Sequence, residues 1–596
     1  MNPAPEPPDL FARADAWAAE DPDPATAAEL RGLVAAARTD EAARAELADR
    51  FAGTLSFGTA GLRAALGAGP NRMNRVVVRH TAAGLARYLL DTAAGAYTPR
   101  AVIGFDARYN SDVFAEETSA ILAAAGIEAF LMPTRLPTPV LAWAVRALDC
   151  EAGVMVTASH NPPQDNGYKV YLGGRAVTDA GQGAQIVTPM DAGIAERISA
   201  SGPLSGIELA AGGWTVLPDA GQPGDVQARY LEAITGLVPA DEAERAHRAG
   251  LRIVLTPMHG VGGDTMSRAF CAAGFTDVRL VPEQAEPDPD FPTVAFPNPE
   301  EPGAMDLALA LAREADADLV IANDPDADRC AAAVNDPATG WRMLTGDEVG
   351  ALLGVHVAAR LAESAAGSAT PGPAAPGPAG PGAFPVFANS IVSSRLLARI
   401  AADAGLAHQT TLTGFKWISR VPGLAFGYEE ALGYCVAPEL VRDKDGMSAA
   451  LLLAEFAAGL KAAGRTLPDE LDALALAHGL HATDQLSVRV ASLEELGTLM
   501  ARLRSEAPAS FSGSPVATAE DLAHGSGQLP PTDAMRYTTA DGSRVIVRPS
   551  GTEPKLKCYL EVIEPVASPA DLPAARRRAG DRLAAVRADT GAALGL

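Results

Sequence analysis

The stretch VMVTASHNPPQDNGYKVY, residues 154–171, begins with an apolar run that is typical of a buried strand. It turns polar at its end, where Ser159 and His160 stand side by side before Asn-Pro-Pro. A serine on a loop directly after a strand often reacts as a nucleophile, but no G-x-S-x-G elbow surrounds this one, and an adjacent histidine does not by itself provide a triad. An N-cap or turn serine is an equally good interpretation of the local pattern.

Strand-like and helix-like segments alternate on both sides of this stretch. RAVIGFDAR (100–108) predicts a buried strand and VFAEETSAILAAAGI (113–127) a helix, and LRIVLTPM (251–258) and TMSRAFCAAGF (265–275) repeat the pattern. Strands that alternate with helices of this length indicate β-α-β units and mostly parallel sheets, so the predicted fold class is α/β. Ligands of such sheets bind beyond the carboxyl ends of the strands, where the polar end of residues 154–171 falls.

The composition limits the class of protein. The chain has 596 residues, enough for about four domains. Its net charge of −25 disfavours nucleic acid or an anionic membrane as a partner, and an anionic substrate would need cations gathered locally, because charges are screened within about 8 Å. Five scattered cysteines without a C-x-x-C predict neither a disulfide framework nor a zinc site. The start resembles no signal peptide and no membrane-length apolar run occurs, so a cytoplasmic protein is expected.

A second polar loop follows the apolar segment DLVIAND (318–324). Asp324, Asp326 and Asp328 alternate there, and Pro325 rules out a regular helix. Three carboxylates this close repel one another unless a cation is present, and an all-oxygen ligand set favours Mg²⁺ over zinc. The loop lacks the glycine and the closing glutamate of an EF-hand, and it matches a haloacid-dehalogenase-type nucleophile poorly. A solvated acidic turn is the alternative.

Two later segments carry polar groups that suit a phosphorylated sugar. FGYEEALGYCV (426–436) ends a predicted strand with paired carboxylates, which accept hydrogen bonds from sugar hydroxyls, although a surface acidic loop explains it at least as well. RVIVRPSGTEPKLKCYLE (544–561) delivers Arg548 on a predicted strand and continues with a Ser-Gly-Thr turn. This arrangement predicts a phosphate cradle with the local positive charge that an acidic protein needs, and an ordinary β-turn is the alternative.

Three other regions show a distinct composition. Residues 10–50 have the pattern of amphipathic helices. Residues 363–385 are rich in Pro, Gly and Ala, which predicts a flexible surface insertion within a domain, with a linker between domains as the alternative. After about residue 485 the pattern becomes antiparallel strands flanked by helices, which predicts a C-terminal α+β domain.

The motifs T-A-S-H-N-P-P, N-D-P-D-A-D-R and R-P-S-G-T-E-P, together with F-G-T-A-G-L-R at 57–63, occur along nearly the whole chain. On these motifs the chain resembles the α-D-phosphohexomutase family, in the branch of phosphoglucomutases and phosphopentomutase-like enzymes. The resemblance implies a four-domain architecture around a central cleft, with three mixed α/β sheet domains and a C-terminal α+β domain. The expected domains are 1–225, 226–340, 341–480 and 481–596.

The resemblance also implies roles for the polar residues. Ser159 is expected to carry a phosphoryl group to a sugar monophosphate and to recover one from the other end of the resulting bisphosphate, so that it needs no triad. Ser159 and the three aspartates are expected to hold Mg²⁺. Arg63 should approach the phosphoserine, and His160 or Lys169 should move the proton of the sugar hydroxyl. The residues expected to bind the substrate are Arg329, Gly414, Lys416, Glu429, Glu430, Arg548, Ser550, Gly551 and Thr552.

One departure from the family pattern concerns specificity. Many phosphohexomutases have Glu-x-Ser in the sugar loop, whereas this chain has Glu429-Glu430-Ala431. A serine hydroxyl is therefore missing, or Glu430, Tyr428 or Tyr434 replaces it, and one such hydrogen bond can change discrimination strongly.

The expected reaction is the interconversion of hexose 1-phosphate and hexose 6-phosphate, with glucose favoured and mannose as a further substrate. The resemblance implies Mg²⁺ as cofactor and glucose 1,6-bisphosphate as activator. Phosphopentomutase activity on ribose or deoxyribose phosphates is the first alternative, and a metal-dependent sugar-phosphate phosphohydrolase is the second.

Overall fold

The computed structural model describes residues 9–367, 384–490, 493–527, 529–550 and 555–595. The chain divides into two compact units. The first unit comprises Met1–Ala333 and Ala437–Glu455, and the second comprises Val334–Val436 and Phe456–Leu596.

The largest sheet lies in the first unit. Its strands follow the order β1 (Leu62–Ala65), β5 (Asp165–Leu172), β4 (Ala152–Val156), β2 (Arg100–Phe105), β3 (Glu128–Leu131) and β7 (Thr215–Val216), and β6 (Ala184–Gln185) pairs with β5. Strands β4, β2, β3 and β7 are parallel, whereas β5 is antiparallel to both β4 and β1. The sheet is therefore mixed, and the predicted strand at 100–108 is confirmed.

Four helices cover this sheet, namely α4 (Arg75–Ala93), α5 (Ser111–Ala124), α6 (Thr138–Ala147) and α7 (Met190–Ser199). On one face, Ile103 of β2 and Val154 of β4 pack in a common core with residues of α4, α5 and α7. On the other face, Gly153 lies so close to α6 that a Cβ there would come within 2.3 Å of a methyl group of Val145. Because successive residues of a strand point to opposite faces, one apolar strand serves both helix layers.

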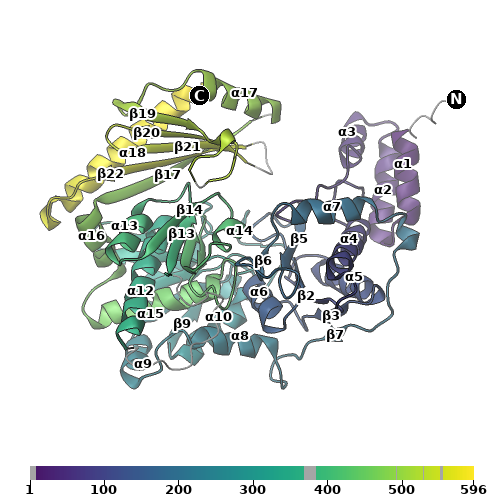
Figure 1. The fold of residues 1–596 in the computed structure, drawn as a ribbon, viewed down its shortest axis with the longest axis horizontal. Helices are drawn as coiled ribbons and strands as arrows, with labels where there is room; N and C mark the ends of the chain where they lie inside the picture. The colour runs from purple at the N-terminus through teal and green to yellow at the C-terminus, as the bar shows by residue number, and fades with distance from the viewer. Residues whose placement is uncertain (1–8, 368–383, 491–492, 528, 551–554, 596) are drawn as a thin grey trace. The chain divides into compact units, whose positions relative to one another are not determined.

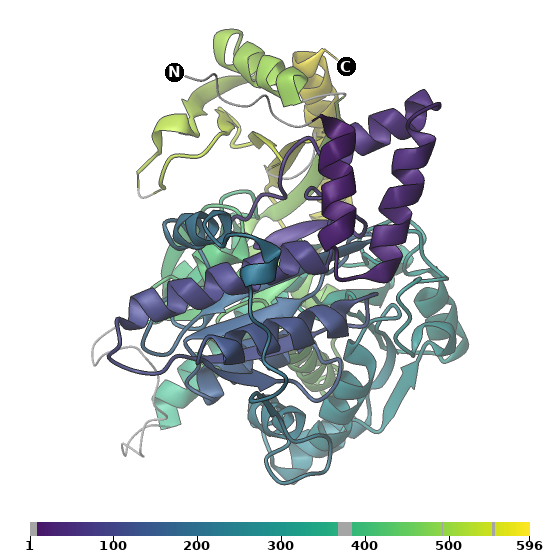
Figure 2. The same ribbon diagram turned by 90° about the vertical axis from the view of Figure 1, so that its right-hand side faces the viewer.

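Three helices precede this sheet, namely α1 (Leu10–Glu20), α2 (Pro24–Ala36) and α3 (Glu41–Arg50), which are purple in Figures 1 and 2. Each begins after an aspartate (Asp9, Asp23 or Asp40) whose carboxylate accepts a hydrogen bond from a backbone N–H of the first turn. Leu30 and Leu47 are buried in the core that the three helices share. The helices predicted over residues 10–50 are confirmed.

The first unit contains a second group of parallel strands, in the order β10 (Leu319–Ala322), β8 (Arg252–Thr256) and β9 (Asp277–Leu280). The helices of this part are α8 (Val226–Thr235), α9 (Glu242–Ala249), α10 (Gly262–Ala273) and α11 (Asp306–Glu314). Every residue of β10 is buried, so the apolar run before the aspartates is a central strand, as predicted. The aspartates follow the carboxyl end of β10, where parallel sheets bind their ligands.

The boundary between the units falls within β11 (Ala331–Asp336), which β12 (Gly340–Met343) follows along the chain. The second unit contains a sheet in the order β14 (Ala407–Thr411), β13 (Val386–Ser390), β15 (Leu424–Glu429) and β16 (Gly433–Cys435). Strands β14, β13 and β15 are parallel and β16 is antiparallel to β15. The helices of this part are α12 (Gly346–Gly367), α13 (Leu396–Asp403) and α14 (Phe415–Ile418).

The last sheet of the second unit is antiparallel. Its order is β17 (Leu480–Arg489), β22 (Lys555–Glu564), β21 (Arg544–Pro549), β20 (Met535–Thr539), β19 (Ser514–Asp521) and β18 (Ser510–Phe511). The accompanying helices are α16 (Leu467–His478), α17 (Leu493–Ser505) and α18 (Leu572–Leu594). Helix α18 packs along β17 and β22 (Figure 1). The predicted C-terminal α+β arrangement is confirmed.

The predicted insertion at 363–385 begins differently from the expectation. Residues 363–367 continue α12, because the Ala-rich segment favours helix and the first proline comes only at Pro371. Residues 368–383 lie outside the described residues.

Over the ranges that are described, no single helix is long and apolar enough to cross a bilayer, although α15 (Gly446–Ala462) and α16 pass that test jointly as a bent pair.

A buried carboxylate, Glu561 on β22, connects the two sheets of the second unit. Arg395 donates to its Oε2 at 2.6 Å, and an Nη of Arg544 lies 3.1 Å from the same oxygen. Ser394 Oγ and His481 Nδ1 lie 2.9 Å and 3.1 Å from Oε1. Burial opposes the charge of Glu561, but Arg544 and the other partners outweigh it and hold the pKa of this carboxyl well below its usual range.

Replacing Glu561 with glutamine should lower the free energy of unfolding of this unit by about 3 kcal/mol, because Arg395 and Arg544 would remain buried without a counter-charge. The measurement is the midpoint of urea denaturation, followed by circular dichroism. Glu506→Gln is the matched control, because the Glu506 side chain is 72% exposed and its pair with Arg502 contributes less than about 1 kcal/mol. Equal midpoints for the two variants would contradict the expectation.

Candidate functional site

Ser159 lies on the tight loop between β4 and β5, at the carboxyl end of β4. Its backbone φ is 52°, in the left-handed region that residues other than glycine rarely adopt. Its N–H donates to Thr157 Oγ1 at 2.8 Å, and only 3% of the residue is exposed. A strand follows the loop, so Ser159 is not a helix N-cap, and strained backbone of this kind is concentrated at functional sites.

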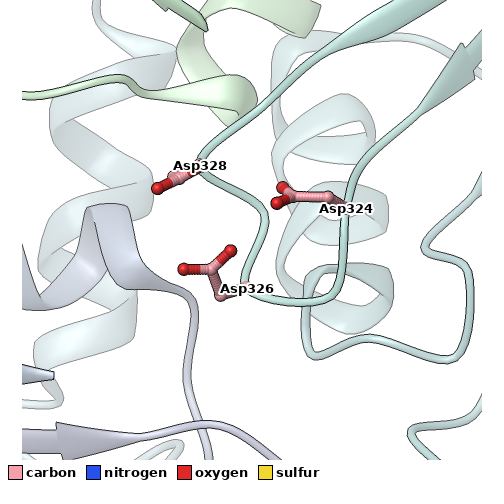
Figure 3. Close-up of side chains that lie close together, drawn as sticks. All are labelled: Asp324, Asp326 and Asp328. Atoms are coloured by element: carbon pink, nitrogen blue, oxygen red, sulfur yellow. The ribbon is translucent and has the colours of Figure 1, made fainter. Parts of the chain in front are cut away.

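The aspartate loop meets this serine within the first unit. Ser159 Oγ donates a 2.7 Å hydrogen bond to Asp324 Oδ2. Asp324, Asp326 and Asp328 are buried on one loop, and one carboxylate oxygen of each lies within 4.8 Å of the others (Figure 3). Two loops that are far apart in the sequence therefore form one cluster, with Ser159 after β4 of one sheet and the aspartates after β10 of another.

Two carboxylate oxygens of this cluster accept no hydrogen bond from the described residues. Asp326 Oδ1 and Asp328 Oδ1 are buried and accept no hydrogen bond from the part of the chain that the structure describes. Buried carboxylate oxygens are costly unless they are paired or bind a cation. Three carboxylates and the hydroxyl of Ser159 form an all-oxygen donor set that fits a hard divalent cation such as Mg²⁺.

Cationic side chains offset part of the negative charge of the cluster. Lys169 Nζ lies 2.6 Å from Asp326 Oδ2 and 2.8 Å from Asp328 Oδ2, and Lys444 Nζ lies 3.1 Å from Asp328 Oδ2. Arg329 is farther away, with its Nε 3.9 Å from Asp328 Oδ1. Burial alone would lower the pKa of Lys169, but the two carboxylates outweigh it and raise that pKa, so its ammonium group keeps its charge.

The surroundings also shift the pKa values of the two groups that contact Ser159 Oγ. Burial, reinforced by the charge of Asp326, raises the pKa of Asp324 well above its usual range. Burial and the positive charge of Arg329 hold the pKa of His160 well below 6.5. The imidazole is therefore neutral at pH 7, and its Nδ1 lies 3.2 Å from Ser159 Oγ.

Two cations reach this region from distant segments of the chain. Arg63 on β1 donates from Nη1 to Asn161 Oδ1 at 3.2 Å, which brings it to the serine loop. Lys444 reaches the aspartates because the start of α15 packs tightly on their loop, where a Cβ at Gly446 would lie 2.2 Å from Arg329 O. Lys444 had no predicted role, and its position between Asp443 and Asp445 is the only sequence signal that could have singled it out.

In the second unit, β15 ends at Glu429, the first of the two acids predicted to bind sugar hydroxyls. Glu430 Oε2 accepts hydrogen bonds from Ser390 Oγ at 2.9 Å and from Ser393 Oγ at 2.8 Å. Ser390 ends β13, the parallel neighbour of β15, and Ser393 follows it, so the two loops meet at one edge of the sheet. Two serine hydroxyls therefore contact Glu430, the acid beside Ala431, and no sequence pattern indicated these contacts.

The predicted phosphate cradle lies in the same unit. Burial and the charge of Glu430 raise the pKa of Tyr559 on β22, whereas Arg548, near the end of β21, acts to lower it. Tyr559 thus lies close enough to both the sugar loop and Arg548 to be affected by their charges. Gly414 is the N-cap of α14, and Lys416 lies within that helix.

The turn after Arg548 is described only in part. Ser550 N–H donates to Lys555 O at 2.7 Å, which joins the two sides of the turn. Gly551 and Thr552 lie outside the described residues, so their predicted contacts with phosphate stay a prediction.

Four family models match consecutive parts of the chain. Their descriptions are phosphoglucomutase/phosphomannomutase, alpha/beta/alpha domain I, domain II and domain III, and C-terminal domain, and they match residues 54–201, 228–340, 345–476 and 488–576.

Individual proteins show the same likeness. A protein of Haemophilus influenzae named probable phosphomannomutase is 43% identical over 489 residues, which cover 82% of this chain and 93% of the relative. The phosphopentomutase of Homo sapiens is 33% identical over 586 residues, which cover 92% of this chain and 90% of the relative. A solved structure with a similar fold is the open form of pp63/parafusin, a phosphoglucomutase from Paramecium. The TM-score is 0.66 at 18% identity, and the match covers 91% of this chain and 96% of that one.

Proposed function

Because the chain belongs to the phosphoglucomutase/phosphomannomutase family and is a phosphosugar mutase, we propose that it interconverts hexose 1-phosphate and hexose 6-phosphate. The observation that carries the proposal is the 2.7 Å hydrogen bond from Ser159 Oγ to Asp324 within a buried carboxylate cluster. A serine in this place suits a carrier of phosphoryl groups, which needs charge neutralisation and precise placement rather than a catalytic triad.

In the proposed reaction Ser159 Oγ holds the phosphoryl group between substrate and product. The P–O bond to the serine breaks as a bond to the free hydroxyl of a hexose monophosphate forms, which yields a hexose bisphosphate. The bisphosphate then returns the phosphoryl group at its other end to the serine, and glucose 1,6-bisphosphate can load the serine initially. His160, whose Nδ1 lies 3.2 Å from Ser159 Oγ, and Lys169 are the groups that we propose to exchange the hydroxyl proton.

The three aspartates and Ser159 would hold Mg²⁺. When bound, this ion neutralises negative charge on the transferring phosphoryl group. Lys169 and Lys444 contact the same carboxylates and keep positive charge at the site. Such local cations are what a protein with a net charge of −25 needs to bind an anionic substrate.

We propose that further side chains contact the substrate. Arg548 and Ser550 would bind the phosphate that is not being transferred. A guanidinium fork and a turn can bind the phosphate at either end of the sugar, the 1-phosphate or the 6-phosphate. Glu430, oriented by its two serine partners, would accept hydrogen bonds from ring hydroxyls. The other proposed contacts are Arg63, Arg329, Gly414, Lys416, Glu429, Gly551 and Thr552.

The name of the Haemophilus influenzae relative supports a hexose, and the G-Y-E-E-A-L-G-Y form of the sugar loop leads us to favour glucose, with mannose as a further substrate. Phosphopentomutase activity is the second candidate, because the human relative of that name matches 92% of this chain. We further propose a cytoplasmic location and small sugar phosphates as the only ligands besides Mg²⁺.

The purified protein, supplied with Mg²⁺ and glucose 1,6-bisphosphate, should convert glucose 1-phosphate with a kcat/KM at least about tenfold above that for ribose 1-phosphate, since a site built to hydrogen-bond one sugar discriminates strongly against another. Coupled assays with glucose, mannose, glucosamine and ribose phosphates measure this ratio. A preference for ribose 1-phosphate would replace the hexose assignment with a pentose. Steady release of inorganic phosphate would instead indicate a phosphohydrolase.

A further inference from the structure

We propose that Arg108 positions Ser159 for phosphoryl transfer by binding the backbone of the serine loop from inside the protein. Its Nη2 donates to Ser159 O at 2.6 Å and to Asn161 O at 2.5 Å. Its Nη1 donates to Pro162 O at 2.8 Å and to Asp165 O at 3.0 Å. One guanidinium group therefore fixes four carbonyl groups across the loop, which its planar array of donors allows.

The loop needs this support because its conformation at Ser159 is unfavourable for a residue with a side chain, with a φ of 52°. On the amide side, the N–H of Ser159 is held by Thr157 Oγ1 at 2.8 Å. On the carbonyl side, Arg108 is the donor. The two contacts fix the peptide groups on both sides of Ser159, and with them the direction of its Oγ toward Asp324.

Arg108 is itself held on two sides. Its backbone N–H donates to Asp106 Oδ1 at 2.9 Å, and the ring of Phe291 covers its guanidinium, with 5.0 Å between the guanidinium carbon and the ring centroid. The hydroxyl of its neighbour Tyr109 donates to Asp290, the residue before Phe291, at 3.0 Å, so Arg108 and Tyr109 both contact this second segment. The Arg108 side chain is only 1% exposed, so it acts through the loop rather than by touching the substrate.

This inference rests on the proposed function, because the direction of Ser159 Oγ matters for catalysis only if that oxygen carries the phosphoryl group. A lysine at position 108 keeps the positive charge but lacks the planar fork that reaches four carbonyls. Misplacing a reacting group by about 1 Å costs about 100-fold in rate. The affinity for the sugar phosphate, which we assign to other loops, should change little.

The experiment compares the steady-state kinetics of Arg108→Lys and Arg248→Lys with glucose 1-phosphate and glucose 1,6-bisphosphate. Arg248 is the matched control, because it is also buried and donates to two carbonyls, Ala273 O and Pro239 O, both at 2.7 Å. Arg108→Lys should lower kcat about 100-fold and change KM by less than about threefold. Arg248→Lys should keep kcat within about twofold of the wild-type value.

An Arg108→Lys enzyme with a kcat within about threefold of wild type would overturn the inference, and so would an equal loss of kcat in both variants. If Arg108→Lys does not fold, the kinetics of Phe291→Leu test the inference instead. This variant removes the ring that covers the guanidinium of Arg108, and it should lower kcat about fivefold at unchanged KM. An unchanged kcat in Phe291→Leu would then refute the role of Arg108. Failure of the proposed function can be distinguished from failure of this inference. In that case the wild-type protein itself would neither convert hexose phosphates nor carry phosphate on Ser159.

Discussion

Replacing Ser159 with alanine should lower the turnover of hexose phosphates by at least about 10⁴-fold. The variant loses the oxygen that we propose to carry the phosphoryl group. His160 and Asp324, which contact that oxygen at 3.2 Å and 2.7 Å, keep their places but have no phosphoryl group to transfer. A coupled assay with glucose 1-phosphate, Mg²⁺ and glucose 1,6-bisphosphate measures the loss, and circular dichroism shows whether the fold is kept.

Ser119→Ala is the matched control for this experiment. Ser119 is a buried serine of α5 in the same unit, and its hydroxyl donates to Ala115 O at 2.9 Å, away from the aspartates. Its replacement removes one ordinary hydrogen bond, worth about 1 kcal/mol, and should leave turnover within about twofold of wild type. Mass spectrometry should find one phosphoryl group on Ser159 of the active wild-type enzyme. Turnover above about 1% of wild type in Ser159→Ala would refute the carrier role.

The strands around these residues could be predicted because their residue pattern is local. The run Leu319–Ala322 is apolar at every position, which only a strand covered on both faces can bury, and the structure places it there. The helices over residues 10–50 and the antiparallel C-terminal strands likewise follow from their periodicity. The four domain boundaries stay a prediction, because composition changes gradually at each of them.

The proximity of Ser159 and Asp324 could be predicted only from the resemblance to the family, because β4 and β10 belong to different sheets. The side chains that support the site could not be predicted. Lys444 reaches the aspartates only through the packing of α15, and Arg108 reads as an ordinary charged residue at the end of a strand. Contacts of this kind depend on tertiary packing between distant segments, for which one sequence contains no local signal.

Removing divalent cations should lower the activity by at least about 10³-fold, and adding Mg²⁺ should restore it, because a bound ion contributes several kcal/mol to stabilising the transferring phosphoryl group. The structural reason is the pair of buried oxygens, Asp326 Oδ1 and Asp328 Oδ1, that accept no hydrogen bond from the described residues. Activity is measured after treatment with a chelator and again after titration with Mg²⁺. Full activity in excess chelator would contradict the metal assignment.

A second measurement locates the ion independently of turnover. A ligand that binds only the folded protein raises the melting temperature, so Mg²⁺ should stabilise the wild-type protein against heat. Asp326→Asn removes one ligand charge from the buried cluster and should abolish that rise. Asp264→Asn, at a side chain of the same unit that is 72% exposed, should retain it. Equal stabilisation of the two variants by Mg²⁺ would show that the ion binds elsewhere, even if activity depends on the ion. The reason is that removing the charge of Asp326 lowers the affinity for Mg²⁺ when that carboxylate is a ligand of the ion.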